Sequence, residues 1–162
     1  MARRMLHASS MCDVDWDEDE EDTIPARSLR PARVLIADDD EALRFLLTTR
    51  LVDEGYQVTE AESGNHVLLR IRERRRAVPD LPPFDLVLLD QRMPDGVGLD
   101  AVRAIRAQGE RFPIILMTAF PDPALLEEAE RLLVPILAKP FPLSKLSRLA
   151  ARSIHARNQL PE

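Results

Sequence analysis

Short apolar runs alternate with stretches of helical periodicity along the chain from residue 33 onward. Val34–Ala37 is apolar and is followed by three aspartates, a pattern that predicts a buried strand. Leu43, Leu47 and Leu51 then recur at helical spacing. Leu46 is expected to fill the same face, so this segment predicts an amphipathic helix packed on the strand.

The later segments repeat this rhythm. Phe84–Leu89 is apolar on both faces apart from Asp85, as the central strand of a parallel sheet requires. The three prolines of Ala77–Pro83 predict a loop, and Met93–Gly96 predicts a turn. The other predicted strands are Tyr56–Glu60, Pro113–Met117 and Ile136–Ala138, and the other predicted helices are Val67–Arg76, Leu99–Ala107, residues 123–133 and Leu143 to about Ala156. Five strands alternating with five helices predict an α/β protein with a mostly parallel sheet.

Length and composition limit the class of protein. A chain of 162 residues fits one domain with a tail. Its single cysteine, Cys12, excludes a disulfide framework and a multi-cysteine metal site. The longest apolar run, Leu132–Ala138, is far shorter than the ~20 residues that span a bilayer, and no signal peptide is apparent. We therefore expect a cytoplasmic protein without membrane insertion.

The net charge of −6 is distributed unevenly. Residues 13–22 hold eight acids and no base, so residues 1–31 are expected to form an acidic, disordered tail. The alternative is that this tail docks on a basic partner, with Trp16 as a weak anchor. The rest of the chain has no basic excess, which disfavours direct DNA binding.

Charged and polar side chains stand where the predicted strands end. Asp38–Asp40 follow the first strand, Asp90 follows the third, Thr118 the fourth and Lys139 the fifth. Parallel strands bring these side chains to one edge of the sheet, where ligands bind in open α/β folds. Because clustered carboxylates repel one another and offer only oxygen ligands, we expect a bound Mg²⁺.

Two further features refine this site. The chain contains twenty arginines but only two lysines, so a lysine at position 139 suggests a need for a compact ammonium. Asp40 and Glu41 are expected at a helix N-terminus, favoured by the helix dipole, rather than on the metal.

Four segments in this order resemble the receiver domain of two-component response regulators: VLIADDDEALRFLL, FDLVLLDQRMPDGVGLD, IILMTA and AKPF. The resemblance covers roughly residues 32–155. It implies a flavodoxin-like, doubly wound fold with strand order 2-1-3-4-5 along the chain and helices on both faces. We expect a receiver domain over residues 32–157 and a C-terminal tail over 158–162.

The resemblance also assigns roles to individual residues. Asp90 corresponds to the phospho-acceptor, which takes the phosphoryl group from a partner histidine as an aspartyl phosphate. Asp38 and Asp39 correspond to the acidic pair that holds Mg²⁺ together with Asp90, and Arg92 offers a backbone carbonyl. The hydroxyl and ammonium that bind the phosphoryl oxygens correspond to Thr118 and Lys139.

The sequence departs from the family where an aromatic switch residue usually stands. Ile136 occupies that position, after Pro135, and the connection from Thr118 is about one residue short. We therefore expect signalling through Thr118 and loop movement, with little rearrangement of Ile136. Phe120 and Arg92 are expected to flank the path of the hydrolytic water and to set the lifetime of the phosphoryl group.

The favoured function is a stand-alone receiver, phosphorylated by a sensor histidine kinase or a histidine phosphotransfer protein. Its output would be protein–protein contacts with an unknown target or onward phosphotransfer, without classical enzymatic turnover. Leu125, Leu126, Leu133 and Arg148–Arg152 are expected in the output surface. Two alternatives remain: a receiver-like interaction module that has lost switching, and a haloacid-dehalogenase-type phosphatase, which the chain length and the DQRMPDG segment disfavour.

Overall fold

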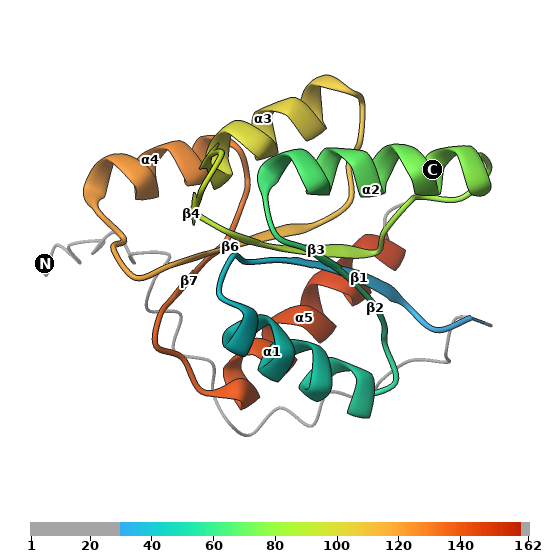
Figure 1. Ribbon diagram of the computed structural model, residues 1–162, viewed down its shortest axis with the longest axis horizontal. Coiled ribbons are helices and arrows are strands. Elements are labelled where there is room, and N and C mark those ends of the chain that lie inside the picture. Colours follow the sequence, from blue (N-terminus) through green and yellow to red (C-terminus); the bar gives the residue numbers. More distant parts are fainter. Residues whose placement is uncertain (1–29, 160–162) are drawn as a thin grey trace, which may run out of the picture.

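One parallel sheet organises the protein, which is seen here in a computed structural model that describes residues 30–159 (Figure 1). Its strands are β1 (Arg33–Ala37), β2 (Gln57–Ala61), β3 (Leu86–Asp90), β6 (Ile114–Thr118) and β7 (Ile136–Ala138). They pair in parallel in the order β2-β1-β3-β6-β7. Numbered along the chain, this is the predicted order 2-1-3-4-5 of a flavodoxin-like fold.

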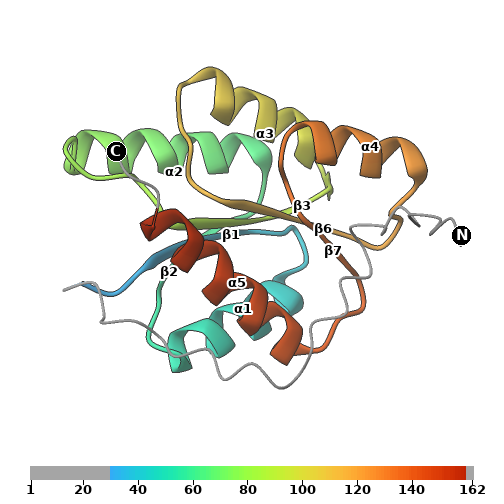
Figure 2. The same cartoon turned by 180° about the vertical axis from the view of Figure 1, so that it is seen from behind.

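Five helices cover the two faces of the sheet. They are α1 (Glu41–Asp53), α2 (Gly64–Ala77), α3 (Gly98–Ala107), α4 (Pro123–Arg131) and α5 (Leu143–Asn158). Helices α1 and α5 lie on one face, and α2, α3 and α4 lie on the other (Figures 1 and 2). Within the described residues, no helix is both long enough and apolar enough to cross a bilayer.

The central strands are buried on both faces, as predicted. In β1, Leu35 and Ala37 contribute to the apolar cluster beneath α2, α3 and α4. Val34 and Ile36 contribute to the cluster beneath α1 and α5. Because alternate side chains of a strand point to opposite faces, a five-residue apolar strand supplies both halves of the core.

Helix α1 differs from the prediction in which residues it buries. Its buried residues are Arg44, Leu47 and Leu51, whereas Leu46 is 48% exposed. The inclusion of Leu46 in the packed face was therefore wrong. Positions 44, 47 and 51 follow the helical repeat, and an arginine occupies the place where the leucine pattern suggested an apolar residue.

The segment after β3 is more ordered than the predicted turn. β4 (Arg92–Met93) and β5 (Gly96–Val97) form a two-stranded antiparallel hairpin. Elsewhere the predicted element boundaries differ from the structure by at most three residues. The predicted tails, 1–31 and 158–162, lie outside the described residues except for positions 30–31 and 158–159.

Candidate active site

Strand register brings the predicted site residues to one edge of the sheet. Asp38 follows β1 and Asp90 ends β3, and the pairing of these neighbouring strands brings the two aspartates side by side. Thr118 ends β6, and Lys139 follows the paired strand β7. The backbone N–H of Lys139 donates to the carbonyl of Thr118 at 2.7 Å, which fixes this second pair at the same edge.

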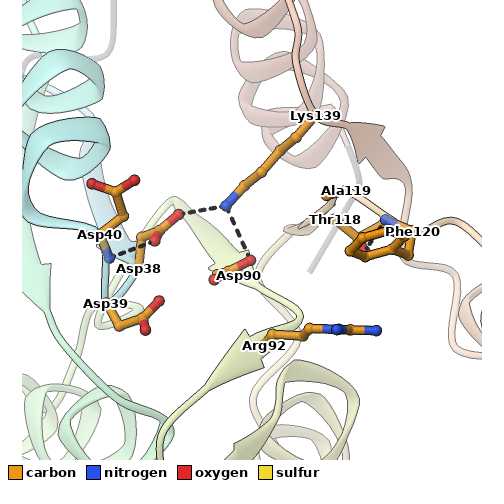
Figure 3. Close-up of a pocket in the computed structure, with 9 residues that line it drawn as sticks. All are labelled: Asp38, Asp39, Asp40, Asp90, Arg92, Thr118, Ala119, Phe120 and Lys139. Atoms are coloured by element: carbon orange, nitrogen blue, oxygen red, sulfur yellow. Dashed lines mark hydrogen bonds and ion pairs between the residues drawn. The ribbon is translucent and has the colours of Figure 1, made fainter.

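These side chains border a cleft of about 300 Å³. In Figure 3 the aspartates line one side, Lys139 enters from above, and Thr118 and Phe120 lie on the opposite side. The full lining is Asp38, Asp39, Asp40, Asp90, Arg92, Thr118, Ala119, Phe120 and Lys139. The structure therefore brings together every residue predicted for the site.

Lys139 bridges the two buried carboxylates. Its Nζ lies 2.8 Å from Asp38 Oδ2 and 3.1 Å from Asp90 Oδ1. Burial of the ammonium acts to lower its pKa, but the hydrogen bond and charge of Asp38, together with those of Asp90, raise the pKa above its ordinary value. Lys139 is therefore a permanent cation at neutral pH.

At Asp90, burial has a larger effect on the pKa than the attractive contacts do. Its pKa is raised above the ordinary value, first by burial and then by the nearby charge of Asp38. Lys139 and a backbone hydrogen bond from Arg92 counteract part of this increase. The ionised form of Asp90 is thus costly in this cleft, and an additional cation would stabilise it.

Three carboxylates are arranged so that they could share such a cation. Oxygens of Asp38, Asp39 and Asp90 all lie within 4.8 Å of one another, and Asp39 is exposed at the mouth of the cleft. An all-oxygen set of charged ligands with an open side suits Mg²⁺, which keeps several of its waters. Asp38 Oδ1 also accepts from the Asp40 N–H at 2.9 Å, which orients its carboxylate.

Asp40 and Glu41 have the helix-start role that was predicted for them. Asp40 is the N-cap of α1, and its side chain accepts from the Leu43 N–H at 3.1 Å. Glu41 lies in the first turn of the helix. Both assignments follow the preference of acids for helix N-termini.

Thr118, Phe120 and Arg92 close the other side of the cleft. Thr118 is buried, and its Oγ1 accepts from the Phe120 N–H at 3.1 Å. The Phe120 ring is 61% exposed, and the Arg92 guanidinium carbon lies 4.7 Å from its centroid. This distance is that of a cation–π contact.

Two polar contacts that support the site were not predicted. The buried Arg44 Nη1 donates to the Asp38 carbonyl at 2.6 Å, which holds the end of β1. Asp95, in the hairpin turn after Asp90, accepts from the N–H groups of Gly64 and Asn65 at the start of α2. A turn aspartate and an arginine within a helix are common in many contexts, so no signal in the sequence singled out either residue.

Gly98 is a third residue that sequence reasoning missed. A Cβ at this position would lie 2.5 Å from the Asp90 carbonyl and 2.8 Å from a Leu116 methyl. Its N–H donates to the Gln91 carbonyl at 2.8 Å. A glycine is therefore needed where α3 begins directly against the end of β3.

Known proteins share both sequence and fold with this chain. The family profile described as the response regulator receiver domain matches residues 34–151. The transcriptional regulatory protein PdtaR of Mycobacterium tuberculosis is 35% identical over 126 residues, which cover 76% of this chain and 57% of the relative. A probable transcriptional regulatory protein of Picosynechococcus is 33% identical over 130 residues, covering 76% of this chain and 49% of the relative. This chain thus spans about half the length of these two relatives.

Relatives of similar length and solved structures match as well. The sporulation initiation phosphotransferase F of Bacillus subtilis is 30% identical over 115 residues, covering 70% of this chain and 86% of the relative. The structure of the chemotaxis protein CheY4 of Vibrio cholerae covers 76% of this chain and 98% of its own, with a TM-score of 0.67 and 28% identity. The HemR receiver domain of Leptospira biflexa covers 82% and 98%, with a TM-score of 0.68 and 29% identity.

Proposed function

We propose, because this chain belongs to the response regulator receiver domain family, that it accepts a phosphoryl group on the Asp90 carboxylate in a magnesium-dependent reaction. The observation that carries the proposal is the position of Lys139 Nζ, within hydrogen-bond distance of both Asp38 and Asp90 in an acidic cleft. An ammonium and clustered carboxylates at one sheet edge are the parts that phosphoryl transfer to a carboxylate needs.

Transfer from a phosphohistidine donor makes one bond and breaks one. An oxygen of the ionised Asp90 attacks phosphorus as the bond from phosphorus to the donor nitrogen breaks, and the electron pair leaves with the imidazole. Water later attacks the acyl phosphate, which restores Asp90 and releases inorganic phosphate. The chain thus promotes its own phosphorylation and dephosphorylation but is not a classical turnover enzyme.

Asp38, Asp39 and Asp90 are the proposed side-chain ligands of Mg²⁺, together with the backbone carbonyl of Arg92. When bound, Mg²⁺ supplies positive charge that balances the carboxylates and the phosphoryl oxygens. Asp38 also holds Lys139 in position, and Arg44 holds the Asp38 backbone.

Lys139 and Thr118 are proposed to bind the transferred group. Lys139 contacts Asp90 Oδ1 and can turn its ammonium to a phosphoryl oxygen formed there. Thr118 Oγ1 accepts a hydrogen bond from the Phe120 backbone, so its own hydroxyl proton is available to donate. Such a donor would draw the loop that begins at Thr118 toward the phosphoryl group.

Receiver domains of response regulators interact with histidine kinases or phosphotransfer proteins, and helix α1 offers a surface for such a donor. Phe45 is 70% exposed and Leu46 is 48% exposed, on a helix that begins directly after Asp38–Asp40. Large apolar side chains exposed beside a reactive cleft are typical of a protein interface. We place this exchange in the cytoplasm, where disulfides are rare. A chain with a single cysteine, which cannot form an internal disulfide, agrees with that compartment.

The docking role of α1 can be tested separately from the chemistry. A Phe45→Ala variant is expected to be phosphorylated by acetyl phosphate at the normal rate, since the small donor does not contact α1. Its rate with a phosphohistidine donor protein should fall about tenfold, as removal of an interface anchor costs about 1–2 kcal/mol. Equal loss with both donors would contradict the docking assignment.

The proposed output is a protein–protein contact or onward phosphotransfer. Leu133 is 84% exposed between α4 and β7, whereas Leu125, expected in the same surface, is buried. A relative of similar length is named a phosphotransferase, which supports onward transfer as one form of output.

A receiver-like interaction module without switching is the alternative, and Ile136 is the residue that favours it. Ile136 is buried in the apolar cluster beneath α2–α4, so it cannot turn inward as an exposed aromatic residue would. The two functions differ in whether Asp90 reacts at all.

Incubation with acetyl phosphate and Mg²⁺, followed by intact mass measurement, decides between them. We expect one phosphoryl adduct that disappears in Asp90→Asn and when Mg²⁺ is removed. No adduct on the native chain would favour the interaction module. Continuous release of phosphate from many esters would instead point to a phosphatase.

A further inference from the structure

A second cleft lies at the C-terminal end of helix α2 and has no part in the proposed phosphoryl chemistry. It has a volume of about 250 Å³. Its lining is Ile71, Arg72, Arg75 and Arg76 of α2 with Gln108 and Glu110, which follow α3. Ile71 is almost fully buried and, as the one apolar residue of this lining, supplies the apolar base of the cleft.

One of these arginines is fixed in place. The Arg75 Nη2 donates to Glu110 Oε2 at 2.6 Å and its Nε donates to Oε1 at 3.0 Å. Its Nη1 also donates to the carbonyls of Pro79 and Leu81. Because the Glu110 carboxylate is paired with Arg75, its charge does not neutralise Arg72 or Arg76.

Arg72 and Arg76 carry the uncompensated charge. Both are exposed, and among residues 30–159 neither forms an ion pair. Glu73, the one acid of α2, pairs instead with Arg70. The cleft therefore combines an apolar base with two available guanidinium groups, which suits an aromatic side chain flanked by carboxylates.

The chain contains a segment with this chemistry. Residues 13–22 carry eight acids, and Trp16, the only tryptophan of the chain, lies between Asp15 and Asp17. A tryptophan ring fills a space of this size and stacks on guanidinium groups.

The segment also enters the domain at the correct end. β1 begins at the edge of the sheet where α2 ends, on the right in Figure 1. Asp90 ends the parallel strand β3 and therefore lies at the opposite edge. Arg30 is anchored where β1 begins, because its Nη1 and Nη2 donate to Asp85 at 2.9 and 3.2 Å. The fourteen residue-to-residue steps from Trp16 to Arg30 span at most ~50 Å when extended, which is longer than the ~21 Å of a fourteen-residue helix such as α2.

We propose that the cleft of Arg72, Arg75 and Arg76 binds the acidic segment 13–22 of the same chain, with Trp16 inside the cleft and the flanking aspartates paired with Arg72 and Arg76. A tethered segment is present at an effective concentration near the millimolar range, so modest contacts suffice. The occupant is intramolecular rather than nucleic acid, because the chain as a whole is acidic and the acidic segment is covalently tethered to the domain.

Trp16 provides its own probe, since its fluorescence is the only tryptophan signal of the full chain. We expect a blue-shifted emission and protection from acrylamide in the native chain. In the double variant Arg72→Glu and Arg76→Glu, the emission should shift to longer wavelength and the protection should be lost. High salt should produce the same shift in the native chain, because it screens ion pairs.

Control variants separate this contact from general charge effects. Lys145→Glu with Arg148→Glu makes the same charge change on α5 and should leave the emission unchanged; far-UV circular dichroism confirms that all variants fold. Adding Asp15→Lys and Asp17→Lys to the Arg72/Arg76 double variant should restore the blue-shifted emission, since the ion pairs re-form with reversed sign.

Three results would overturn the proposal. The first is a Trp16 emission that is the same in the native chain and the Arg72/Arg76 double variant. The second is an emission that changes with protein dilution, which would assign the cleft to the segment of a second copy. The third is a Trp16 that is unprotected in the native chain while a short DNA duplex binds at physiological salt and is lost in the Arg72/Arg76 double variant, which would assign the cleft to phosphate groups.

Discussion

At the residue scale, the contact between Arg92 and Phe120 links the two loops that border the phosphorylation cleft. Arg92 follows β3 and Phe120 follows β6, and the guanidinium lies 4.7 Å from the ring centroid. An exposed cation–π contact of this kind contributes about 0.5–1 kcal/mol. If the two side chains must separate before water reaches the phosphoryl group, this contact slows hydrolysis.

We therefore expect Arg92→Ala and Phe120→Ala each to speed loss of the phosphoryl adduct by about 2- to 5-fold, the factor that corresponds to that free energy. The decay of the adduct by intact mass, after removal of acetyl phosphate, measures the rate. Arg131→Ala, an exposed arginine of α4, serves as the control and should leave the rate unchanged. Equal lifetimes of the phosphoryl adduct in all three variants would contradict the proposal that the Arg92–Phe120 contact slows hydrolysis.

Asp85 is the charged residue that interrupts the otherwise apolar β3 segment, and the structure explains its presence. Its carboxylate accepts from the Arg33 N–H at 2.7 Å and from Arg157 at 2.9 Å, besides its bonds to Arg30. Burial acts to raise its pKa, but the Arg30 and Arg33 hydrogen bonds and the arginine charges outweigh burial, so the pKa is lowered. A lowered carboxyl pKa stabilises the fold above the unfolded-state pKa and loses that effect as pH falls through the folded-state pKa.

Asp85→Asn is expected to lower the free energy of unfolding at neutral pH by about 3 kcal/mol, because it leaves the buried Arg33 and the partly buried Arg30 and Arg157 without their counter-charge. The loss should shrink at acidic pH, below the ordinary aspartate range, where the native carboxyl also becomes protonated. Urea titrations across pH measure both effects. An equal deficit at all pH values would show that packing rather than charge is responsible, and Asp80→Asn, in the exposed loop, is the matched control.

At the element scale, the end of helix α4 adopts a conformation that normally requires glycine. Leu133 has a φ of +56°, in the left-handed region, and is 84% exposed. The N–H of Val134 donates to the Ala129 carbonyl at 2.9 Å, the bond that closes a helix in a Schellman motif. The leucine thus bears backbone strain without burying its side chain.

We expect Leu133→Gly to raise the free energy of unfolding by about 1 kcal/mol, the usual cost of a non-glycine residue in the left-handed region. Leu133→Ala keeps a Cβ and should change stability little. Chemical denaturation of the three proteins makes the comparison. A glycine variant no more stable than the alanine variant would mean that the turn is unstrained.

The helices and strands were largely predictable because each long element carries a regular apolar repeat. Two features were not. The β4–β5 hairpin consists of two-residue strands, which are too short to show any alternation. In α1, Leu46 belongs to a dense leucine run, so periodicity alone could not show that Arg44 rather than Leu46 faces inward. The expectation that Ile136 moves little on phosphorylation stays a prediction for methyl NMR.

At the scale of the whole molecule, the site was predictable because topology alone places it. Once the strands are parallel, residues directly after them meet at one edge, as Asp38, Asp90 and Lys139 do. Residues that support the site from elsewhere, such as Asp95 and Gly98, depend on the packing of α2 and α3 against that edge. No sequence pattern encodes those distances, so these residues were missed.

If the three carboxylates bind magnesium as proposed, the stability of the whole domain depends on that ion. Without a bound ion, the raised pKa of Asp90 means that the fold loses stability as pH rises above the unfolded-state aspartate pKa. An ion that binds only the folded chain offsets this loss. At a concentration one hundred times its Kd, it would add about 2.7 kcal/mol.

We therefore expect Mg²⁺ to raise the melting temperature at neutral pH by roughly 6–10 °C, from the usual relation between free energy and Tm for a domain of this size.

Asp39→Asn should stabilise the metal-free protein by about 1 kcal/mol or less, because Asp39 is exposed and its repulsion of Asp38 and Asp90 is well screened. The same variant should lose most of the Mg²⁺ effect, whereas Asp53→Asn, an acid at the far end of α1, should keep it. Thermal melts in Mg²⁺ and in NaCl of equal ionic strength distinguish binding from screening. Equal melting temperatures in the two salts would argue that the three carboxylates do not share a cation, even if Asp90 still reacts with acetyl phosphate.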